Sequence, residues 1–311
     1  LKTLSDVYNN QDLSVINFKT ASTIALILES QLRGNKNYIY SPKDLFIKNN
    51  EVLALSCSVV LDNKNPSKYK CSNKKNINLS NMKIIFIRQD PPYNMAYITS
   101  LHILELIDQE KTKIVNEPKG IRNSPEKILI FNFPKLIPPT IVTRSKKHIV
   151  EFLKIHKKAV IKPLYGNGGD NIYLISKNDL NLNQIIESFI SKNKEQFIIQ
   201  RYIPEIIKGD KRIILVNGDP VGAIARVPKN NEIRSNIHVG GSAKKILLSK
   251  SDRIICEIIG PELRKRKLFF VGIDVIGKYL IEINVTSPTC IREIKQLSKI
   301  DIAKIIWDKL A

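Results

Sequence analysis

The sequence predicts two units in tandem, a small open α/β sheet over residues 1–120 and a larger α+β unit over residues 121–311. Three observations support this. Short apolar strands alternate with helix-length segments as far as Gly120, whereas closely spaced strands dominate the chain beyond it. The length of 311 residues and the hydrophobic content of 43% supply more than one core. No internal repeat is apparent, so the two units are expected to differ.

The first unit begins with an amphipathic segment at 20–34, whose apolar residues follow a helical period up to a glycine. The polar stretch at 63–76 predicts a solvated surface loop. Apolar runs and the turn residues that bound them predict the remaining elements. These are a strand at 37–40, a buried strand at 82–92 that ends in a Pro-Pro turn, a helix at 97–109 and a strand at 112–118.

The second unit is predicted from the same periodicities. Its expected helices lie at 124–132, 146–156, 181–192, 250–266 and 299–310. Its expected strands lie at 159–164, 171–176 and 197–203, with two strand-rich segments at 211–228 and 268–285.

Composition excludes several classes of protein. No apolar run reaches the roughly 18 residues that a membrane-spanning helix requires, and the first residues lack the basic start and apolar core of a signal peptide. The four cysteines are far apart and have no zinc-ligand spacing, so we interpret them as reduced thiols. We therefore expect a cytoplasmic protein with no membrane partner.

The charge balance is strongly basic, with 50 Lys and Arg against 29 Asp and Glu, a formal charge of +21. The lysines are spread along the chain among many Ile and Asn residues, which favours drift in base composition over a selected binding face. No aromatic-rich basic stripe accompanies them, so no nucleic-acid partner is expected. A diffuse positive field would still attract anionic substrates such as ATP.

A glycine-rich segment, KPLYGNGGDN at 162–171, follows one of the predicted strands. Glycines let backbone N–H groups approach phosphate oxygens, and the lysine supplies a compact cation. Alone, the segment is better explained as a plain hairpin turn, since it matches neither of the common glycine-rich nucleotide motifs. Its meaning depends on the residues downstream.

Asp274, Glu282 and Asn284 interrupt otherwise apolar strands in the segment 270–288. Buried acids are costly unless they are paired or bind a metal, and oxygen ligands of this kind suit Mg²⁺. The alternative is an edge strand whose polar residues face water, but the flanking positions are too apolar for that. Residues two apart on a strand share a face, so Glu282 and Asn284 point the same way.

Two acids can share a metal most simply if they lie directly opposite each other in the hairpin. The midpoint between Asp274 and Glu282 is Lys278, which predicts a three-residue loop at 277–279 with a bulge. A two-residue turn would instead pair Asp274 with Ile281 and separate the carboxylates. Opposed like charges would repel, so Mg²⁺ is expected to offset their repulsion.

Three arginines, Arg212, Arg226 and Arg234, lie in and after the segment 211–228. The guanidinium group binds carboxylates or phosphates with two hydrogen bonds. Each residue alone is better explained by a surface ion pair, and only the three together favour an anion site. The polar loop 228–241 ends in Gly-Gly, which predicts a mobile cover over an anionic substrate.

The motifs together resemble prokaryotic glutathione synthetases of the ATP-grasp superfamily, in the same order from about residue 16 to 311. The most specific of them is EINVTSP after VGIDVIG. The resemblance rests on RQDPP (88–92), NSPEK (123–127), KPLYGNGG (162–169), GDKRIIL (209–215), ARVP, RSN and VGG (225–241), VGIDVIG (271–277) and EINVTSP (282–288).

The resemblance implies that ATP joins γ-glutamylcysteine to glycine through an acyl phosphate, giving glutathione, ADP and phosphate. It implies Mg²⁺ or Mn²⁺, a homotetramer, and a pre-ATP-grasp domain before an ATP-grasp fold with subdomains at 121–203 and 204–311. The residue types found in the motifs are consistent with this reaction. A carboxylate needs a leaving group before an amine can attack it, and cations neutralise the charge of the phosphoryl group during its transfer.

Residue roles follow from the same resemblance. The implied ATP-binding residues are Lys127, Lys162, Gly166, Asn167, Gly168, Gly169, Gln200, Arg201, Tyr202, Ile203 and Asp210. The implied metal ligands are Asp274, Glu282 and Asn284, and the charge-stabilising catalytic residues are Arg212 and Arg226. The implied substrate-binding residues are Arg88, Arg234, Asn236, Gly240, Gly241, Ser287 and Pro288.

The sequence departs from the family in three places. The opening strand is replaced by SDVYNNQDL at 5–13, which predicts a weak or missing strand, and Ala21 stands where a helix-capping Asp is usual. Asp170 and Asn171 stand where the phosphate loop usually has small residues. The competing interpretations are another ATP-grasp ligase, which joins D-alanine units or adds glutamate to a protein tail, a drifted non-catalytic nucleotide-binding protein, and a nucleic-acid binder.

Overall fold

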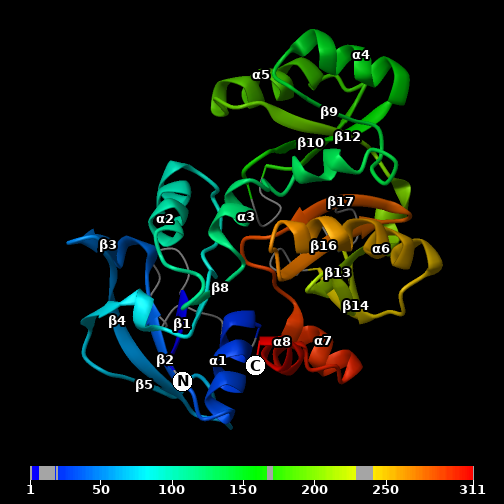
Figure 1. Cartoon of the computed structure of the whole chain (residues 1–311). Coiled ribbons are helices and arrows are strands. Elements are labelled where there is room, and N and C mark those ends of the chain that lie inside the picture. Colours follow the sequence, from blue (N-terminus) through cyan, green and yellow to red (C-terminus); the bar gives the residue numbers. More distant parts are fainter. Residues whose placement is uncertain (1, 7–17, 19, 167–170, 229–240, 311) are drawn as a thin grey trace.

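The computed structural model describes residues 2–6, 18, 20–166, 171–228 and 241–310. In this part of the chain the strands form three sheets, with eight, four and five strands (Figure 1). The first belongs to the N-terminal region and combines parallel and antiparallel pairs, and the other two are antiparallel. This confirms an α/β unit followed by an α+β unit.

The first sheet has the order β3-β4-β2-β1-β7-β8, and β5 and β6 also pair with β4. Its centre is parallel, because β1 pairs with β2 and β7, and β7 pairs with β8. The strands are β1 (Lys2–Asp6), β2 (Lys36–Tyr40), β3 (Leu45–Lys48), β4 (Glu51–Leu61), β5 (Tyr69–Cys71), β6 (Lys75–Asn78), β7 (Ile84–Phe86) and β8 (Lys113–Val115). The helices are α1 (Ser22–Leu32), α2 (Met95–Glu105) and the short α3 (Pro118–Arg122), with 3₁₀ turns η2 (Pro42–Asp44) and η3 (Leu79–Asn81).

The opening strand, expected to be weak or missing, is not missing. It is present as the short strand β1 and ends inside the segment 5–13, and its backbone pairs on both sides, which supplies ladder hydrogen bonds without a long apolar run. The prediction that 63–76 is only a loop is wrong, because β5 lies in this stretch and β6 begins in it, both at the sheet edge, where exposed polar side chains are tolerated. Helix α1 does begin after Ala21, and no side chain caps it.

The second sheet has the order β11-β10-β12-β9 and is covered on one side by α4 and α5 (Figure 1). Apolar residues of the two helices and the strands form their own core, which includes Ile149, Phe152, Ile186 and Phe197. The elements are β9 (Thr140–Thr143), α4 (Lys146–His156), β10 (Lys158–Pro163), β11 (Tyr173–Ser176), α5 (Leu182–Lys192) and β12 (Phe197–Arg201).

The helix predicted at 124–132 is wrong. The chain forms turns in which Ile128 N and Leu129 N both donate to Pro125 O at 2.8 Å, and then a single 3₁₀ turn, η4 (Leu129–Asn132). Pro134 follows closely and has no N–H to extend a helix. The irregular backbone leaves Glu126 and Lys127 in contact with the third sheet.

The third sheet has the order β15-β14-β13-β16-β17. Its elements are η5 (Pro204–Lys208), β13 (Asp210–Val216), β14 (Asp219–Val227), β15 (Ser242–Lys245), α6 (Lys250–Lys265), β16 (Phe270–Ile276), β17 (Tyr279–Asn284), α7 (Ile291–Ser298) and α8 (Ile302–Leu310). The helix expected at 299–310 is α8, whereas α7 was not predicted.

Helix α8 packs against the N-terminal unit, beside α1 (Figure 1). Trp307 Nε1 donates to Leu26 O at 3.0 Å, and the rings of Trp307 and Phe86 lie 5.4 Å apart. Leu26, Phe86 and Trp307 therefore share one hydrophobic core with strands of the third sheet. In the described part of the chain, no helix has the length and apolar character needed to cross a membrane.

Candidate active site

The hairpin of β16 and β17 places Asp274 directly opposite Glu282, as predicted. The predicted loop is wrong, because Ile276 pairs with Tyr279 and the turn contains only Gly277 and Lys278. The register shifts between Asp274 and Val275, so that Ile281 is the extra residue of a bulge. The bulge restores the pairing that a two-residue turn alone would have broken.

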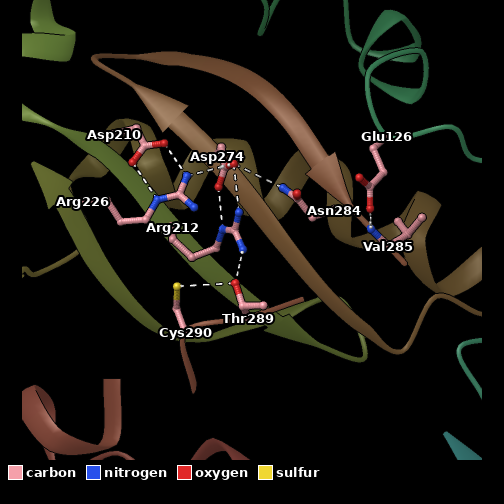
Figure 2. A network of polar contacts seen from close by, with 9 residues as sticks. All are labelled: Glu126, Asp210, Arg212, Arg226, Asp274, Asn284, Val285, Thr289 and Cys290. Atoms are coloured by element: carbon pink, nitrogen blue, oxygen red, sulfur yellow. Dashed lines mark hydrogen bonds and ion pairs between the residues drawn. The ribbon is translucent and has the colours of Figure 1, made fainter. Parts of the chain in front are cut away.

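Two arginines converge on Asp274 from β13 and β14 (Figure 2). Arg212 binds it with two hydrogen bonds, from Nε to Oδ1 at 2.6 Å and from Nη2 to Oδ2 at 3.0 Å. Arg226 Nη2 lies 3.0 Å from Asp274 Oδ2, and its Nε donates to Asp210 Oδ1 at 2.8 Å. All four side chains are buried, so the network is a compact set of paired charges.

The electrostatics of Asp274 follow from these contacts. Burial by itself raises the pKa of Asp274, but Arg212 and Arg226 outweigh it and hold that pKa below its ordinary value. Asp274 is therefore ionised at neutral pH without a metal. Asn284 lies on the same side, with Nδ2 3.4 Å from Asp274 Oδ2.

Two buried lysines, Lys127 and Lys162, lie near Glu282, the cross-strand partner of Asp274. Lys127 Nζ is 3.1 Å from Glu282 Oε1 and donates to Gly166 O at 2.7 Å. Lys162 Nζ donates to Gln200 Oε1 at 2.5 Å. Burial lowers the pKa of Lys162 to about 8, with Lys127 adding to the decrease and Glu282 opposing it. The two cations lie close enough to serve one polyanion.

The other residues assigned to ATP have contacts away from Lys127 and Lys162. Arg201 Nη2 donates to Tyr279 Oη at 3.0 Å, and Tyr202 N donates to Lys158 O at 3.1 Å. Ile203 is buried. Both oxygens of Asp210, the residue assigned to the ribose, accept hydrogen bonds from Arg226. Four residues of the glycine-rich segment lie outside the described residues: Asn167, Gly168, Gly169 and Asp170.

Some of the residues assigned to the substrate have contacts that the structure describes, and others lie outside the described residues. Arg88 is buried at the end of the first sheet, and its Nη2 donates to Pro288 O at 2.8 Å, which brings it to the segment that contains Ser287. Gly241 directly precedes β15. Arg234, Asn236 and Gly240 lie outside the described residues, as does nearly all of the loop 228–241 that was predicted to be mobile.

Three residues in the site were not predicted from the sequence. Glu126 Oε1 accepts hydrogen bonds from the backbone after Asn284, and Asn116 binds the same segment from the end of β8. Burial raises the pKa of Asp90 to about 6, against the effects of Ser287 and Arg88. Glu126 and Asp90 stand inside the motifs NSPEK and RQDPP, so a test of every charged residue in those motifs could have found them.

The donor set formed by Asp274, Glu282 and Asn284 fits Mg²⁺. It offers two carboxylates and an amide oxygen from facing strands, the hard ligands that Mg²⁺ prefers. No group of three His, Cys, Asp or Glu side chains with metal-site geometry occurs among the described residues.

Comparison with protein families gives two matches. The prokaryotic glutathione synthetase N-terminal domain matches residues 9–122, and the prokaryotic glutathione synthetase ATP-grasp domain matches residues 126–299. The glutathione synthetase of Mesorhizobium japonicum is 44% identical over 296 residues, 95% of this chain and 94% of that protein. The glutathione synthetase of Agrobacterium fabrum is 43% identical, over 96% and 93% of the two chains.

Solved structures agree on the fold. The D-cycloserine synthetase DcsG superposes with a TM-score of 0.70 at 12% identity, covering 99% of this chain and all of that one. The ATP-grasp ligase PsnB, in a complex with a minimal precursor, Mg and ADP, has a TM-score of 0.61 at 12% identity, over 99% and 96%. These similarities establish an ATP-grasp fold. The identities of 43–44% over nearly the whole length go further: the chain belongs to the prokaryotic glutathione synthetase family.

Proposed function

We propose that the buried charges around the β16–β17 hairpin catalyse the ATP-dependent ligation of γ-glutamylcysteine to glycine. The observation that carries this proposal is the convergence of Arg212 and Arg226 on Asp274, opposite Glu282 and close to Lys127. In such a site, fixed cations can bind the phosphoryl group during its transfer, and fixed carboxylates can bind the metal ions that accompany the phosphates. The same constellation is of little use to a protein that only binds nucleotide.

In the first step, an oxygen of the cysteine carboxylate attacks the γ-phosphorus of ATP. The new O–P bond replaces the bond to the β-phosphate, and ADP leaves. Lys127 and Lys162 would bind the phosphates from the side of the glycine loop. Arg212 and Arg226 would stabilise the charge that develops around the acyl phosphate. Because Asp274 and Asp210 already hold these two side chains, little reorganisation would be needed during the reaction.

In the second step, the amine nitrogen of glycine attacks the acyl carbon. The C–N bond forms as the C–O bond to phosphate breaks, the amine loses a proton, and glutathione and phosphate are released. Arg88, Ser287 and Pro288 would frame the peptide and glycine pockets, with the remaining assigned residues Arg234, Asn236, Gly240 and Gly241 on the loop before β15.

We propose Mg²⁺, with Mn²⁺ as a substitute, as the metal that Asp274, Glu282 and Asn284 would hold. When bound, it would neutralise phosphate charge. The nucleotide contacts would come from Gly166, Asn167, Gly168 and Gly169 over the phosphates and from Gln200, Arg201, Tyr202 and Ile203 at the adenine. Asp210 is better placed to orient Arg226 than to bind the ribose.

Three further features belong to the proposal. The N-terminal domain would span residues 1–120, and the ATP-grasp subdomains 121–203 and 204–311 would each contain one of the antiparallel sheets. A homotetramer and a cytoplasmic location follow from the family alone. Sedimentation of the purified chain would test the assembly.

The test is a phosphate-release assay with γ-glutamylcysteine, glycine, ATP and Mg²⁺, in which each component is omitted in turn. We expect release to require all four and glutathione to accumulate in equal amount. D-alanine-dependent release without γ-glutamylcysteine would identify a different ATP-grasp ligase. Nucleotide binding without any release would indicate a non-catalytic protein.

A further inference from the structure

The segment that leaves β17 has no regular secondary structure of its own. Val285, Thr286 and Ser287 follow Asn284 directly, and they connect the proposed metal ligands to the proposed substrate residues. Backbone groups buried in such a segment need hydrogen-bond partners from elsewhere in the chain. Those partners fix the position of the segment.

One carboxylate oxygen accepts most of these hydrogen bonds. Glu126 Oε1 accepts from Val285 N at 2.9 Å, from Thr286 N at 3.0 Å and from Thr286 Oγ1 at 2.8 Å (Figure 2 shows the first). Three donors on one oxygen define its location narrowly. The backbone of Glu126 adds a fourth bond, in which Ile283 N donates to Glu126 O at 3.2 Å.

The same segment is held at other points. Asn116 Nδ2 donates to Val285 O at 2.9 Å, so both peptide groups of Val285 are bound by side chains from outside the hairpin. Lys127, the neighbour of Glu126 in the sequence, forms an ion pair with Glu282, which lies within β17 two residues before its end. The pair Glu126 and Lys127 thus spans residues 282–286 from the irregular turn before η4.

We propose that Glu126 is a positioning residue of the ligase, which holds the Val285–Thr286 segment so that Asn284 and Ser287 have the correct orientation. The proposal rests on the proposed function for what those two residues bind. Glu126 acts as a hydrogen-bond acceptor through Oε1, which accepts three hydrogen bonds from this segment. Residues that orient metal ligands in this way typically change metal affinity or activity by about 10–100-fold when removed.

If Glu126 acts through the position of its acceptor oxygen, its variants should differ in activity in a different order than if it acts through its negative charge. Glu126→Gln keeps a carbonyl oxygen at the same place, so all three donors retain an acceptor. Glu126→Asp keeps the charge but is one methylene too short to reach them. Glu126→Ala removes the acceptor. We expect the Gln variant to resemble the unmodified protein, and the Asp and Ala variants to be defective.

The first measurement is hydrogen exchange of a peptide covering residues 283–287 in the protein without ligands. The amides of Val285 and Thr286 should exchange about 10-fold faster or more in Glu126→Ala and Glu126→Asp, and at the original rate in Glu126→Gln. A suitable control is Glu105→Ala, which removes a carboxylate that binds Arg122 away from the hairpin. It should leave this peptide unchanged.

The second measurement is the Mg²⁺ concentration for half-maximal phosphate release, together with the KM for glycine. Both should rise about 10-fold or more in Glu126→Asp and stay within about 2-fold in Glu126→Gln. If the Ala variant does not fold, the Asp and Gln variants still decide the outcome.

Two results would overturn the inference. Exchange that is unchanged in both the Ala and the Asp variants would show that the acceptor does not fix the segment. A Gln variant as defective as the Ala variant would show that charge or proton transfer matters instead. If the unmodified protein does not form glutathione, the proposed function fails, while the exchange rates still report on positioning.

Discussion

Lys127 Nζ lies 3.1 Å from Glu282 Oε1, so the second acid of the hairpin has its own cation, as Asp274 has Arg212 and Arg226. This corrects the expectation that Mg²⁺ is needed to offset repulsion between the two opposed carboxylates. Three cations already do so in the protein alone. On the proposed function, ATP and a metal would bind among acids and cations that are already paired in the empty protein.

Glu282→Gln should abolish phosphate release, because it removes one of the two carboxylates proposed to bind the metal. Stability should also fall, by roughly 1–3 kcal/mol, since Lys127 is buried and loses its ion pair. Urea unfolding without ligands measures this change. Glu262→Gln, which loses only a partly exposed pair with Arg266, is the matched control. A variant with near-normal turnover would contradict the assignment of Glu282.

ATP affinity should fall as pH rises through about 8. Burial lowers the pKa of Lys162 to about 8, so in the empty protein this lysine loses its charge above that pH. A bound phosphate favours the protonated form, so affinity is highest below pH 8 and decreases by at most about 10-fold per pH unit above it. Titrations with a fluorescent ATP analogue at pH 6.5–9.5 would show this.

The variant Lys162→Arg provides the control for that titration. Arginine stays charged over the whole pH range, so the decrease should disappear even if the affinity at pH 7 changes. An equal decrease in the variant would assign the pH dependence to another group.

Asp90→Asn should make stability less dependent on pH between about 4 and 6. Burial raises the folded-state pKa of Asp90 to about 6, from an ordinary value of 3.8. The folded protein therefore holds an extra proton in this window, and stability decreases as pH rises through it, by up to about 3 kcal/mol. Urea titrations at pH 4, 5, 6 and 7 measure the effect. Equal slopes for both proteins would show that the burial of Asp90 is not the cause.

Gly209→Ala should destabilise the protein by more than 3 kcal/mol. Gly209 has φ 100° and ψ 160°, a conformation essentially restricted to glycine that costs other residues about 1–3 kcal/mol. A Cβ there would also lie 2.6 Å from Arg226 O. Gly34→Ala is the matched control, because Gly34 has φ 77° and open space around its missing Cβ. Thermal unfolding should rank the two variants; equal losses would contradict the steric argument.

The sequence was sufficient to predict features that depend on periodicity or on chemical necessity. Helix α4 was expected at 146–156 and occurs there, and Asp274 pairs with Glu282, as was expected from the hypothesis of a shared metal. Features that depend on tertiary packing were not predictable. The Ile281 bulge is an example, since nothing local distinguishes Ile281 from its neighbours.

Hydrogen-bond partners that are far apart in the sequence could not be predicted from it either. Glu126 stands in a segment that looked helical, and only the fold shows that its side chain meets Val285, 159 residues later. Asp210 was assigned from a motif, and only the structure shows that Arg226 binds its carboxylate. Pairings of this kind depend on which strands become neighbours.

The contact between α1 and α8 has a consequence for how the protein is made. Trp307 packs on Phe86 and binds Leu26 O, 281 positions earlier in the chain. While the ribosome is still synthesising the third sheet, that part of the N-terminal core is open to water. The N-terminal unit therefore gains the contacts of Leu26 and Phe86 with Trp307 only after α8 has been made.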